Sequence, residues 1–551
     1  MKRLISVVIV TLLLSCSTAE NEGSELTRLD AVAAFADNVL AHGRDVYGDR
    51  HTPLFADGIN VDTKVAAMWV NPSDSTEWML SNLANQQNLF RTLVGLSNMT
   101  GDSRYRDAAV EATEYMIDHH RSGSGLFYWG DTRFVDLRTH ERGYAGSGNH
   151  RFMNMLPFYS FLWEVNPQVA EQLVKAIWDT HVGDWSVLDI NRMGPFTSET
   201  GPVWDQEFVG AEPFFEGRWL SFIPAGTDLI YSAAMLHFLS GQEEPLTWSL
   251  RLAEQYVNAR HPETGLGVGQ YNQPKKREEP PADPENPRYT YSTYGDRAQR
   301  QLGPEFGEIA LEGNVIRIPT AIAIYGYNAA TLLQLGEKLG GSNGEMLVEW
   351  GRAGLHAFAN YGYDPQTNLV RPLLADGTDL TGFELRRPGY YGPEGRSFEP
   401  AKADRLFLYS YVLGYRLTED PILWETARAM ARHQGLGDLG QKPGVEVNIN
   451  WDTENADPVV LLALLDLYQA VPDEDYLALA EQIGDNIVSF RFHDGFFLPT
   501  SSHVNARFDT LEPLALLTLE AVLEGKPELV PRYNTGRTTD DRFRTTWSQT
   551  R

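Results

Sequence analysis

The sequence predicts an all-α protein whose helices form an (α/α) toroid of about six or seven helical hairpins with long functional loops. Three observations predict this fold. Pairs of apolar helical runs joined by short turns recur along the chain, and the alternation typical of strands is nearly absent. The pairs are separated by irregular inserts rich in glycine, proline and aromatic residues, whereas solenoids keep a fixed repeat length. Closure into a ring therefore fits better than an open solenoid.

The clearest hairpin covers residues 88–120, where Thr100-Gly101-Asp102 separates two apolar periodic runs. Gly101 suits the left-handed position after the first helix, and Asp102 or Ser103 can cap the second. Four further hairpins are expected at 232–260, 327–361, 409–434 and 459–490, with breaks at 240–241, 340–341, 418–420 and 472–473.

Composition limits the function. The chain has 551 residues, of which 42% are hydrophobic and 22% charged, as expected of a folded globular protein. A net charge of −28 argues against a nucleic-acid partner, which requires a basic surface. A local arginine cluster can still bind an anionic sugar inside an acidic protein. A single cysteine excludes disulfides within the chain, thiolate zinc clusters and iron–sulfur sites.

The N-terminus predicts export. Lys2 and Arg3 precede an apolar run over residues 4–14, which is typical of a signal peptide covering residues 1–15. Leu13-Leu14-Ser15-Cys16 resembles the bacterial lipoprotein box, so we expect lipidation of Cys16 and a polar tether over residues 16–25. The predicted localisation is the bacterial cell envelope, with the lipid anchor in the outer membrane. An ordinary signal peptide with a coincidental cysteine is the alternative. We expect the toroid to span residues 26–535 and a flexible tail to follow over 536–551.

Polar and aromatic side chains gather in five loops that follow helical hairpins. A toroid brings such loops together at one end, so their joint occurrence indicates a site, although each cluster alone has a structural explanation. The clusters contain Tyr289, Tyr291, Tyr294, Arg297, Glu305, Glu312 and Asn314; Asn149, His150, Arg151 and Asn154; Asp184, Trp185, Asn191 and Arg192; Asn450, Trp451 and Asp452; and His503, Asn505 and Arg507.

The residue types in these loops favour one chemistry. The sequence has no G-x-S-x-G elbow, no H-E-x-x-H motif and no phosphate-binding loop. Two carboxylates for glycoside hydrolysis remain open, with Asp184, Glu305 and Asp452 as the candidates. Tyrosine, histidine, asparagine and arginine suit β-elimination beside a uronate carboxylate. Arginine or asparagine neutralises the carboxylate and acidifies the C5 proton, and tyrosine or histidine moves that proton.

The catalytic assignment places Tyr294 as the proton-transferring residue, with Tyr291 second and His150 as the alternative base. Arg297 lies close to Tyr294 in sequence, where its charge would lower the tyrosine pKa and bind the substrate carboxylate. The alternative is that these tyrosines only pack a loop against the rim of the ring.

Further residues are predicted to contact the sugar. Arg192 with Asn191, and Asn450, would neutralise the carboxylate or orient the ring. Glu305 and Asn314 would hold the loop or bind hydroxyl groups. Asn149, Trp451 and His503 complete the predicted binding set, and Trp129, Trp185 and Trp204 are candidate sugar platforms. No cofactor or metal is expected, although a structural or neutralising divalent cation stays open.

Four stretches resemble bacterial secreted proteins of the pectate-lyase-like kind: residues 81–88 (SNLANQQN), 184–192 (DWSVLDINR), 296–307 (DRAQRQLGPEFG) and 311–314 (LEGN). The chain is similar to (α/α)-barrel polysaccharide lyases that act on alginate, glucuronan or related uronans, from about residue 40 to 530. The resemblance implies a toroid and a lyase that leaves a 4,5-unsaturated uronate on an anionic polysaccharide or its oligosaccharides.

Such relatives often carry histidine near positions 155 and 193, where this chain has Met155 and Met193. This difference leaves a related elimination open, the loss of water from a uronate at the non-reducing end of an oligosaccharide. A glycoside hydrolase and a non-catalytic glycan-binding lipoprotein are the alternatives from other classes.

Overall fold

The computed structural model describes residues 26–72, 74–130, 133–144, 148–274, 297–537 and 544–551. The predicted signal peptide, Cys16 and the tether lie outside these residues, and so do Tyr291 and Tyr294. Among the helices within these ranges, none is long and apolar enough to cross a membrane.

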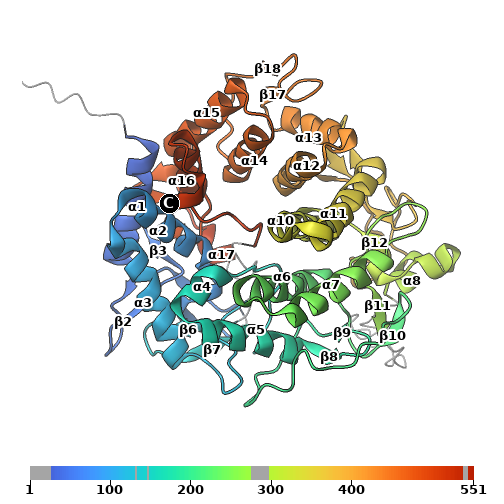
Figure 1. The fold of residues 1–551 in the computed structure, drawn as a ribbon, viewed down its shortest axis with the longest axis horizontal. Helices are drawn as coiled ribbons and strands as arrows, with labels where there is room; N and C mark the ends of the chain where they lie inside the picture. Colours follow the sequence, from blue (N-terminus) through green and yellow to red (C-terminus); the bar gives the residue numbers. More distant parts are fainter. Residues whose placement is uncertain (1–25, 73, 131–132, 145–147, 275–296, 538–543) are drawn as a thin grey trace, which may run out of the picture.

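Fourteen helical segments form seven pairs arranged in a closed ring, counted over the described part of the chain (Figure 1). The inner layer consists of α2 (Gln87–Thr100), α4 (Tyr159–Val165), α6 (Ile223–Ser240), α10 (Ala329–Leu339), α12 (Arg405–Thr418), α14 (Pro458–Ala470) and α16 (Glu512–Leu523). The outer layer consists of α3 (Ser103–His119), α5 (Pro167–His181), α7 (Glu243–Asn258), α11 (Gly341–Tyr361), α13 (Pro421–His433), α15 (Glu474–Arg491) and α1 (Arg28–His42). The predicted all-α toroid is confirmed.

The turns within the hairpins follow the predicted chemistry. Gly101 ends α2 in the left-handed conformation with φ of 76°, and the Asp102 side chain accepts a hydrogen bond from the Arg104 N–H at the start of α3. Gly241 ends α6 in the same way. Sequence periodicity missed the α4–α5 pair, because α4 is short and Pro167 starts α5 almost at once.

The ring closes through the two ends of the chain. Helix α1 packs against α16, and Arg28 of α1 binds Glu520 of α16 through Nε at 2.5 Å. Strand β21 (Asn505–Arg507) pairs antiparallel with β3 (Gly58–Asn60) beside this junction. The apolar core runs around the ring between the two helical layers, and residues 459–467 of α14 are buried on every face.

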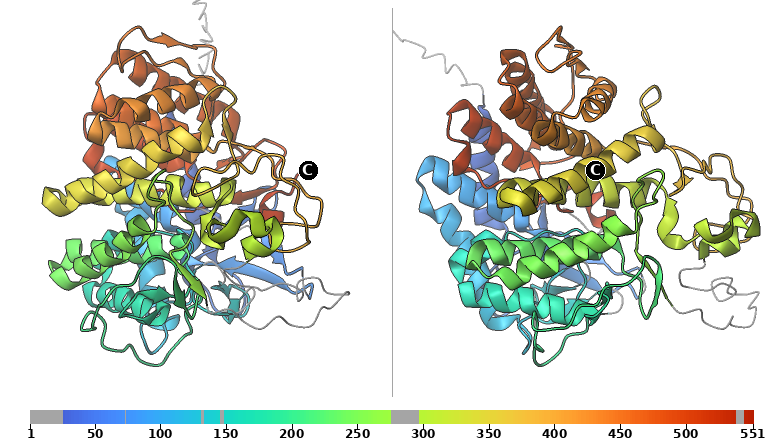
Figure 2. Two further views of the ribbon diagram at one scale, coloured as in Figure 1. Left: turned by 90° about the vertical axis from the view of Figure 1, so that its right-hand side faces the viewer. Right: turned by 45° about the vertical axis from the view of Figure 1, so that its right-hand side comes forward.

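Short strands and long loops gather at one end of the ring, while the turns within the hairpins lie at the other (Figure 2). The largest sheet joins β4 (Met68–Val70), β5 (Glu77–Ser81), β6 (Arg133–Asp136) and β7 (Arg142–Tyr144) in that order. The other strands are β1 (Arg44–Asp45), β2 (Thr52–Phe55), β8 (Val182–Asp184), β9 (Asp189–Ile190), β10 (Phe215–Gly217), β11 (Asn272–Pro274), β12 (Val315–Ile316), β13 (Tyr363–Asp364), β14 (Leu369–Val370), β15 (Leu373–Leu374), β16 (Ala401–Lys402), β17 (Gly437–Asp438), β18 (Asn448–Ile449), β19 (Phe492–His493) and β20 (Phe496–Phe497).

The loop end also carries short helices: α8 (Arg297–Leu302), α9 (Ile318–Ala321), the π-helix η5 (Ile322–Asn328) and the 3-10 helices η1 (Leu83–Asn85), η3 (Pro304–Ile309) and η4 (Glu312–Asn314). α9, η5 and α10 follow one another without a break. A small apolar cluster that includes Ala298, Leu302 and Leu385 joins residues 298–315 to residues 374–398 as a lobe on the rim.

The C-terminal residues differ from the expected flexible tail. After η6 (Pro527–Leu529) the chain runs to Arg537, and the described end of the chain forms α17 (Arg544–Trp547) against β21 and β4. Asn505 donates a hydrogen bond to the Thr546 carbonyl at 2.7 Å. Trp547 packs on the apolar cluster of the β4–β7 sheet. The expectation of a flexible tail is therefore wrong for residues 544–551, because an aromatic side chain anchors them.

Candidate active site

A pocket of about 470 Å³ opens at the loop end, where the inner helix α6 and the short helix α9 begin. Three arginines, three tyrosines and one carboxylate are among the residues that line it. The lining residues are Met153, Asn154, Arg192, Phe222, Ile223, Pro224, Gly269, Gln270, Glu312, Val315, Arg317, Pro319, Thr320, Ile322, Ala323, Tyr327, Tyr390, Tyr391 and Arg537. Helix N-termini carry partial positive charge, so both helices and side chains favour an anionic ligand here.

Arg192 enters the pocket from the turn after β9. The Asn191 carbonyl interacts with His181 Nδ1 at 2.6 Å, and the Asn191 side chain accepts a hydrogen bond from the Met193 N–H at 3.0 Å. This turn directs the Arg192 guanidinium over the Phe222 ring, with Cζ 4.8 Å from the ring centroid. Asn191, predicted to bind substrate, thus shapes the turn that carries Arg192 and does not line the pocket.

Arg317 precedes α9 as its N-cap residue. Its guanidinium stacks on Tyr391, with Cζ 4.9 Å from the ring centroid, and its Nε is buried without a hydrogen-bond partner. Within the described part of the chain, no carboxylate forms an ion pair with Arg317. A buried N–H group without a partner costs about 1–3 kcal/mol, and a ligand carboxylate would remove this cost.

Glu312 forms the wall next to Arg317 and is held by Arg297. Arg297 Nε lies 3.0 Å from Glu312 Oε2, and the Arg297 guanidinium stacks on Tyr390 at 4.1 Å. Arg297 supports two lining residues but does not itself line the pocket. Burial raises the pKa of Tyr391 well above its usual value, and its hydroxyl is enclosed, so Tyr391 remains protonated.

The loop opposite is held by Asp228, in the second turn of α6. Its carboxylate accepts hydrogen bonds from the backbone N–H groups of Asn154 at 2.8 Å, Met155 at 2.7 Å and Leu156 at 3.3 Å. Asn154 and Leu156 have φ of 62° and 44°, a conformation that side chains rarely adopt. Burial raises the pKa of Asp228 to about 7, against the opposing effect of these hydrogen bonds.

His150 is not among the residues that line the pocket. It is 0% exposed, and its Nδ1 faces His181 Nε2 at 2.9 Å. Burial, with His181 and Arg133 nearby, lowers its pKa well below the usual value. A completely enclosed imidazole cannot reach a sugar, so the structure contradicts the role of alternative base that the sequence suggested for His150.

Other predicted residues lie close to the pocket without lining it. Asn314 is buried and donates to the Ile309 carbonyl at 3.0 Å, which supports its predicted part in holding the loop. Glu305 forms a bidentate ion pair with Arg386 on the exposed surface of the rim lobe. Asn149 precedes the buried His150 and is also absent from the pocket lining.

The late loops stay apart from the pocket. Asn450 donates to the Gly435 carbonyl at 2.9 Å in the β17–β18 hairpin, and Trp451 beside it is 49% exposed. His503 Nδ1 interacts with the Thr500 hydroxyl at 2.8 Å, and His503 bridges to Thr550. The expectation that all five loops converge is therefore wrong for these three residues, because β17–β18 and β21 lie on other sectors of the ring. Of the candidate sugar platforms, Trp129 is buried in the core, and Trp185 and Trp204 pack against the core.

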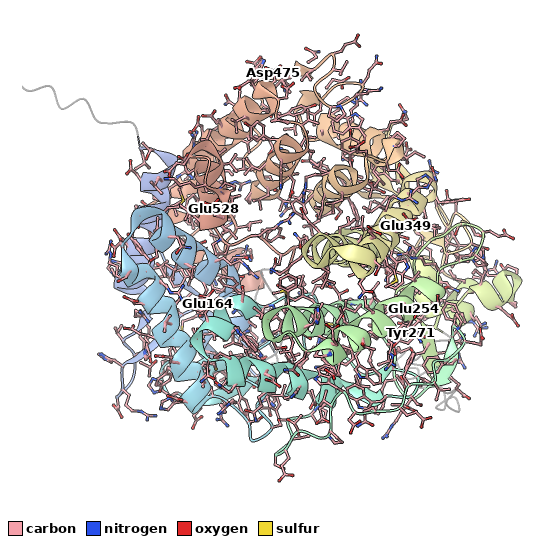
Figure 3. The ribbon with its side chains drawn as sticks, viewed as in Figure 1. Glu164, Glu254, Tyr271, Glu349, Asp475 and Glu528 are labelled. Atoms are coloured by element: carbon pink, nitrogen blue, oxygen red, sulfur yellow. The ribbon has the colours of Figure 1, made fainter. Side chains whose placement is uncertain are left out.

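The pocket gathers positive charge within an acidic protein. Acidic side chains such as Glu254, Glu349 and Asp475 lie on the outer helices (Figure 3), whereas Glu312 is the single carboxylate among the described lining residues. Asp184, Glu305 and Asp452 are not among the lining residues. The paired carboxylates that glycoside hydrolysis needs are thus not present in the described lining. Among all the residues that the structure describes, no group of three or more His, Cys, Asp or Glu could hold a metal ion.

Sequence reasoning missed Arg317, Tyr327, Tyr390 and Arg537. Arg317 follows the LEGN stretch by three positions, and this nearness was the one signal available. Tyr327 lies on η5, and a π-helix often marks a functional site, but no sequence pattern shows its presence. Arg537 falls in the segment expected to be a tail.

Fold and pocket together define a helical ring with a pocket that favours an anionic ligand. The chain belongs to the periplasmic pectate lyase family, whose model matches residues 52–541. A pectate disaccharide-lyase of Dickeya dadantii (strain 3937) is 34% identical over 518 residues, covering 91% of this chain and 90% of that protein. The protein is a carbon–oxygen lyase that performs β-elimination at uronates of an anionic polysaccharide. The predicted likeness to pectate-lyase-like proteins is confirmed, and the non-catalytic and hydrolytic alternatives are set aside.

Solved structures show more distant similarity. An α-mannanase of Bacteroides thetaiotaomicron has a TM-score of 0.41 at 10% identity, covering 91% of this chain and 96% of the other. An unsaturated glucuronyl hydrolase specific for heparin has a TM-score of 0.40 at 12% identity, covering 91% and 98%.

Proposed function

We propose that the substrate is pectate, a polymer of galacturonate, and that the enzyme releases unsaturated disaccharides from it. Support comes from the D. dadantii relative, a pectate disaccharide-lyase that matches along nearly the whole chain. The observation that carries the proposal is the arrangement of Arg192 and Arg317 around one pocket, whose described lining contains a single carboxylate, Glu312, paired with Arg297.

Arg192 and Arg317 bind the carboxylate of the uronate that loses its C5 proton. A guanidinium beside this carboxylate stabilises the negative charge that develops when the C5–H bond breaks. The electron pair then forms the C4–C5 double bond, the C4–O bond breaks, and the departing oxygen takes a proton. Arg317 fits this role because no carboxylate among the residues that the structure describes pairs with its guanidinium.

Proton transfer is assigned to Tyr294, with Tyr291 second, as the sequence predicts. Both lie outside the described residues, and the support is their closeness in sequence to Arg297, whose partners Glu312 and Tyr390 line the pocket. Among the tyrosines of the described lining, Tyr327 is partly buried and lies on η5. Tyr327→Phe is therefore the matched change against which Tyr294→Phe is compared.

The catalytic step is proposed to need no bound metal, because guanidinium groups already stand where a neutralising cation would act. Dialysis against a chelator should leave the rate of unsaturated product unchanged. Loss of activity that a divalent cation restores would contradict this.

Substrate choice is tested with purified enzyme and a panel of polygalacturonate, alginate, glucuronan and saturated oligogalacturonates. The ultraviolet absorbance of the unsaturated uronate reports elimination, and mass spectrometry of the products distinguishes chain cleavage from loss of water at a chain end. Polygalacturonate should give unsaturated disaccharide at the highest rate. A preference for another uronan, or water loss without chain cleavage, would overturn the proposal.

The proposed location is the cell envelope, with a lipid anchor on Cys16 in the outer membrane. The family is described as periplasmic, and the support for the anchor is the Leu13–Cys16 sequence. Labelled palmitate should enter the wild-type protein, and Cys16→Ala should abolish labelling and release the enzyme from the membrane fraction. Labelling that persists in Cys16→Ala would contradict the anchor.

A further inference from the structure

Two arginines lie together on the hairpin of β6 and β7, outside the active-site pocket. In this hairpin Arg133 of β6 pairs directly with Tyr144 of β7. Side chains two positions apart on a strand point to the same face, so Arg142 shares a face with Tyr144, and Arg133 lies opposite Tyr144 on it. The register therefore gathers two guanidinium groups and a phenol ring on one face of the hairpin.

Aromatic rings surround the Arg133 guanidinium. Its Cζ lies 5.5 Å from the ring centroid of Tyr128, 5.3 Å from that of Tyr144 and 4.6 Å from that of Phe196. The Tyr128 and Phe196 rings are stacked on one another, with centroids 4.5 Å apart. Arg142 also lies over Tyr128, with its Cζ 3.9 Å from the ring centroid. The two guanidinium groups thus share one aromatic ring.

Within the described residues, no carboxylate pairs with either arginine. Arg133 Nε is buried without a hydrogen-bond partner, and Arg142 donates to the His119 carbonyl at 2.9 Å. Burial lowers the pKa of Arg133, and Arg142 adds to this effect. The groups that oppose it are Tyr128 and Tyr144, not a carboxylate. In a chain with a net charge of −28, two adjacent cations that no acid neutralises favour an anion from outside the protein.

Part of this cluster is open to a ligand. Tyr144 is 54% exposed, Arg142 is also exposed, and Arg133 is half-buried. Guanidinium groups bind carboxylates through paired hydrogen bonds, and an exposed aromatic ring offers a flat apolar face. A uronate unit carries a carboxylate on a pyranose ring. Its two parts therefore match the two kinds of group in the cluster.

The cluster lies beside the turn that carries Arg192 into the active-site pocket. Phe196 follows Arg192 by four residues, so their Cα atoms are at most about 14 Å apart. The backbone between them is fixed, because Gly194 and His150 exchange two hydrogen bonds, at 2.8 Å and 2.9 Å. No residue of the cluster lines the active-site pocket. The cluster is therefore a separate feature next to that pocket.

We propose that Arg133, Arg142 and Tyr144 form a second uronate-binding site, the hairpin site, which holds a part of the polysaccharide outside the active-site pocket. This inference rests on the proposed function. The guanidinium groups bind the carboxylate of one uronate unit, and its pyranose ring stacks on Tyr144. Substrates long enough to reach from the pocket to the hairpin site gain affinity from both, whereas short oligosaccharides bind the pocket alone.

Arg142→Gln and Tyr144→Ala test the hairpin site, because both side chains are exposed and can be changed without opening the core. We expect each change to raise KM for polygalacturonate by at least about fivefold and to change kcat less than about twofold, because the lost contact holds a non-reacting unit. KM for trigalacturonate should stay within about twofold of the wild-type value. Arg142→Lys should recover part of the affinity for the polymer, since it restores the charge without the bidentate geometry.

Wild-type KM for polygalacturonate in both variants would overturn the hairpin site, and so would an equal rise in KM for trigalacturonate. Arg551→Gln and Tyr361→Ala are the matched controls. Arg551 pairs with Asp62 and Asp494 on the surface, and Tyr361 is 40% exposed at the end of α11. Both controls should keep the wild-type KM for the polymer. A rise as large as in the hairpin variants would overturn the assignment, because the effect would then follow surface charge or aromatic area in general.

Direct binding separates this inference from the proposed function. If wild-type enzyme forms no unsaturated product from polygalacturonate, the proposed function fails, and electrophoresis through native gels that contain polygalacturonate still measures binding. Relative to gels without the polysaccharide, the wild-type protein should be retarded, and Arg142→Gln and Tyr144→Ala should be retarded less. Added salt should reduce the retardation of the wild-type protein, because it screens the guanidinium groups. Equal retardation of all three proteins would overturn the hairpin site.

Discussion

The carboxylate of Asp228 accepts a hydrogen bond from the backbone N–H of Asn154 at 2.8 Å and thereby joins an inner helix to the wall of the active-site pocket. The same carboxylate holds Met155 and Leu156. Arg537 reaches the pocket on the carbonyl of Asn154. One buried acid therefore positions both the wall and Arg537.

Asp228→Asn should lower both stability and substrate affinity. An asparagine keeps one acceptor but turns an NH₂ group toward backbone donors, so we expect a loss of about 1–3 kcal/mol in the free energy of unfolding and a raised KM. Asp509→Asn is the matched control. Asp509 is equally buried and accepts hydrogen bonds from Asn88 at 2.6 Å and Leu89 at 3.4 Å, away from the pocket lining. Urea unfolding and steady-state kinetics on both variants check this, and an equal rise in KM in both would contradict a positioning role for Asp228.

Asp509 should make stability depend on pH. Burial raises its pKa to about 7 in the folded protein, against a usual value of 3.8. The folded state therefore holds a proton that the unfolded state releases. The resulting stabilisation is complete below the unfolded pKa and is lost as pH rises through the folded pKa, by up to about 1.4 kcal/mol per pH unit. Asp509→Asn cannot titrate, so the wild-type free energy of unfolding minus that of the variant should fall between pH 5 and pH 8. A constant difference in urea titrations would refute the raised pKa.

Arg317→Ala should reduce kcat/KM by about a hundredfold or more, because removal of one preorganised donor to a developing charge has an effect of this size. Arg317 has no carboxylate partner among the described residues, so the midpoint of thermal unfolding should change little. Arg317→Lys should restore part of the rate. Initial rates on polygalacturonate, with Arg551→Ala as the surface control, measure the effect. A variant within threefold of the wild-type rate would exclude Arg317 from carboxylate binding.

Tyr294→Phe removes only a hydroxyl group, so the protein should fold and bind substrate while turnover is lost. Tyr327→Phe is the matched change in the described pocket and should retain most of the turnover. Turnover that survives in Tyr294→Phe and disappears in Tyr327→Phe would move proton transfer to Tyr327.

His150→Ala should lower thermal stability, because it empties a buried position, yet retain kcat per folded molecule.

Local sequence was informative about Arg192 and Asn314, because each lies in a short stretch with a recognisable pattern. Local sequence was misleading about His150, because a histidine among polar residues gives the same sequence pattern whether its ring contacts a sugar or a second histidine. Tertiary packing makes that distinction here: His181 and the surrounding core enclose the ring completely. Asn450, Trp451 and His503 also lie in loops that follow hairpins, but these loops lie on other sectors of the ring than the starts of α6 and α9, where the pocket opens.

The helical hairpins could be derived from the sequence alone, since turns such as Thr100-Gly101-Asp102 use only local backbone chemistry and apolar periodicity needs only neighbouring residues. The closed ring follows from those hairpins and their irregular spacing. The active-site pocket required the tertiary structure, because Arg192, Arg317 and Arg537 come from distant segments that meet only when the ring closes. The path of residues 530–537 through the ring is likewise a tertiary result. An extended segment without periodicity carries no local signal, and its partners on α6, α10 and α12 become neighbours only after the inner helices have assembled.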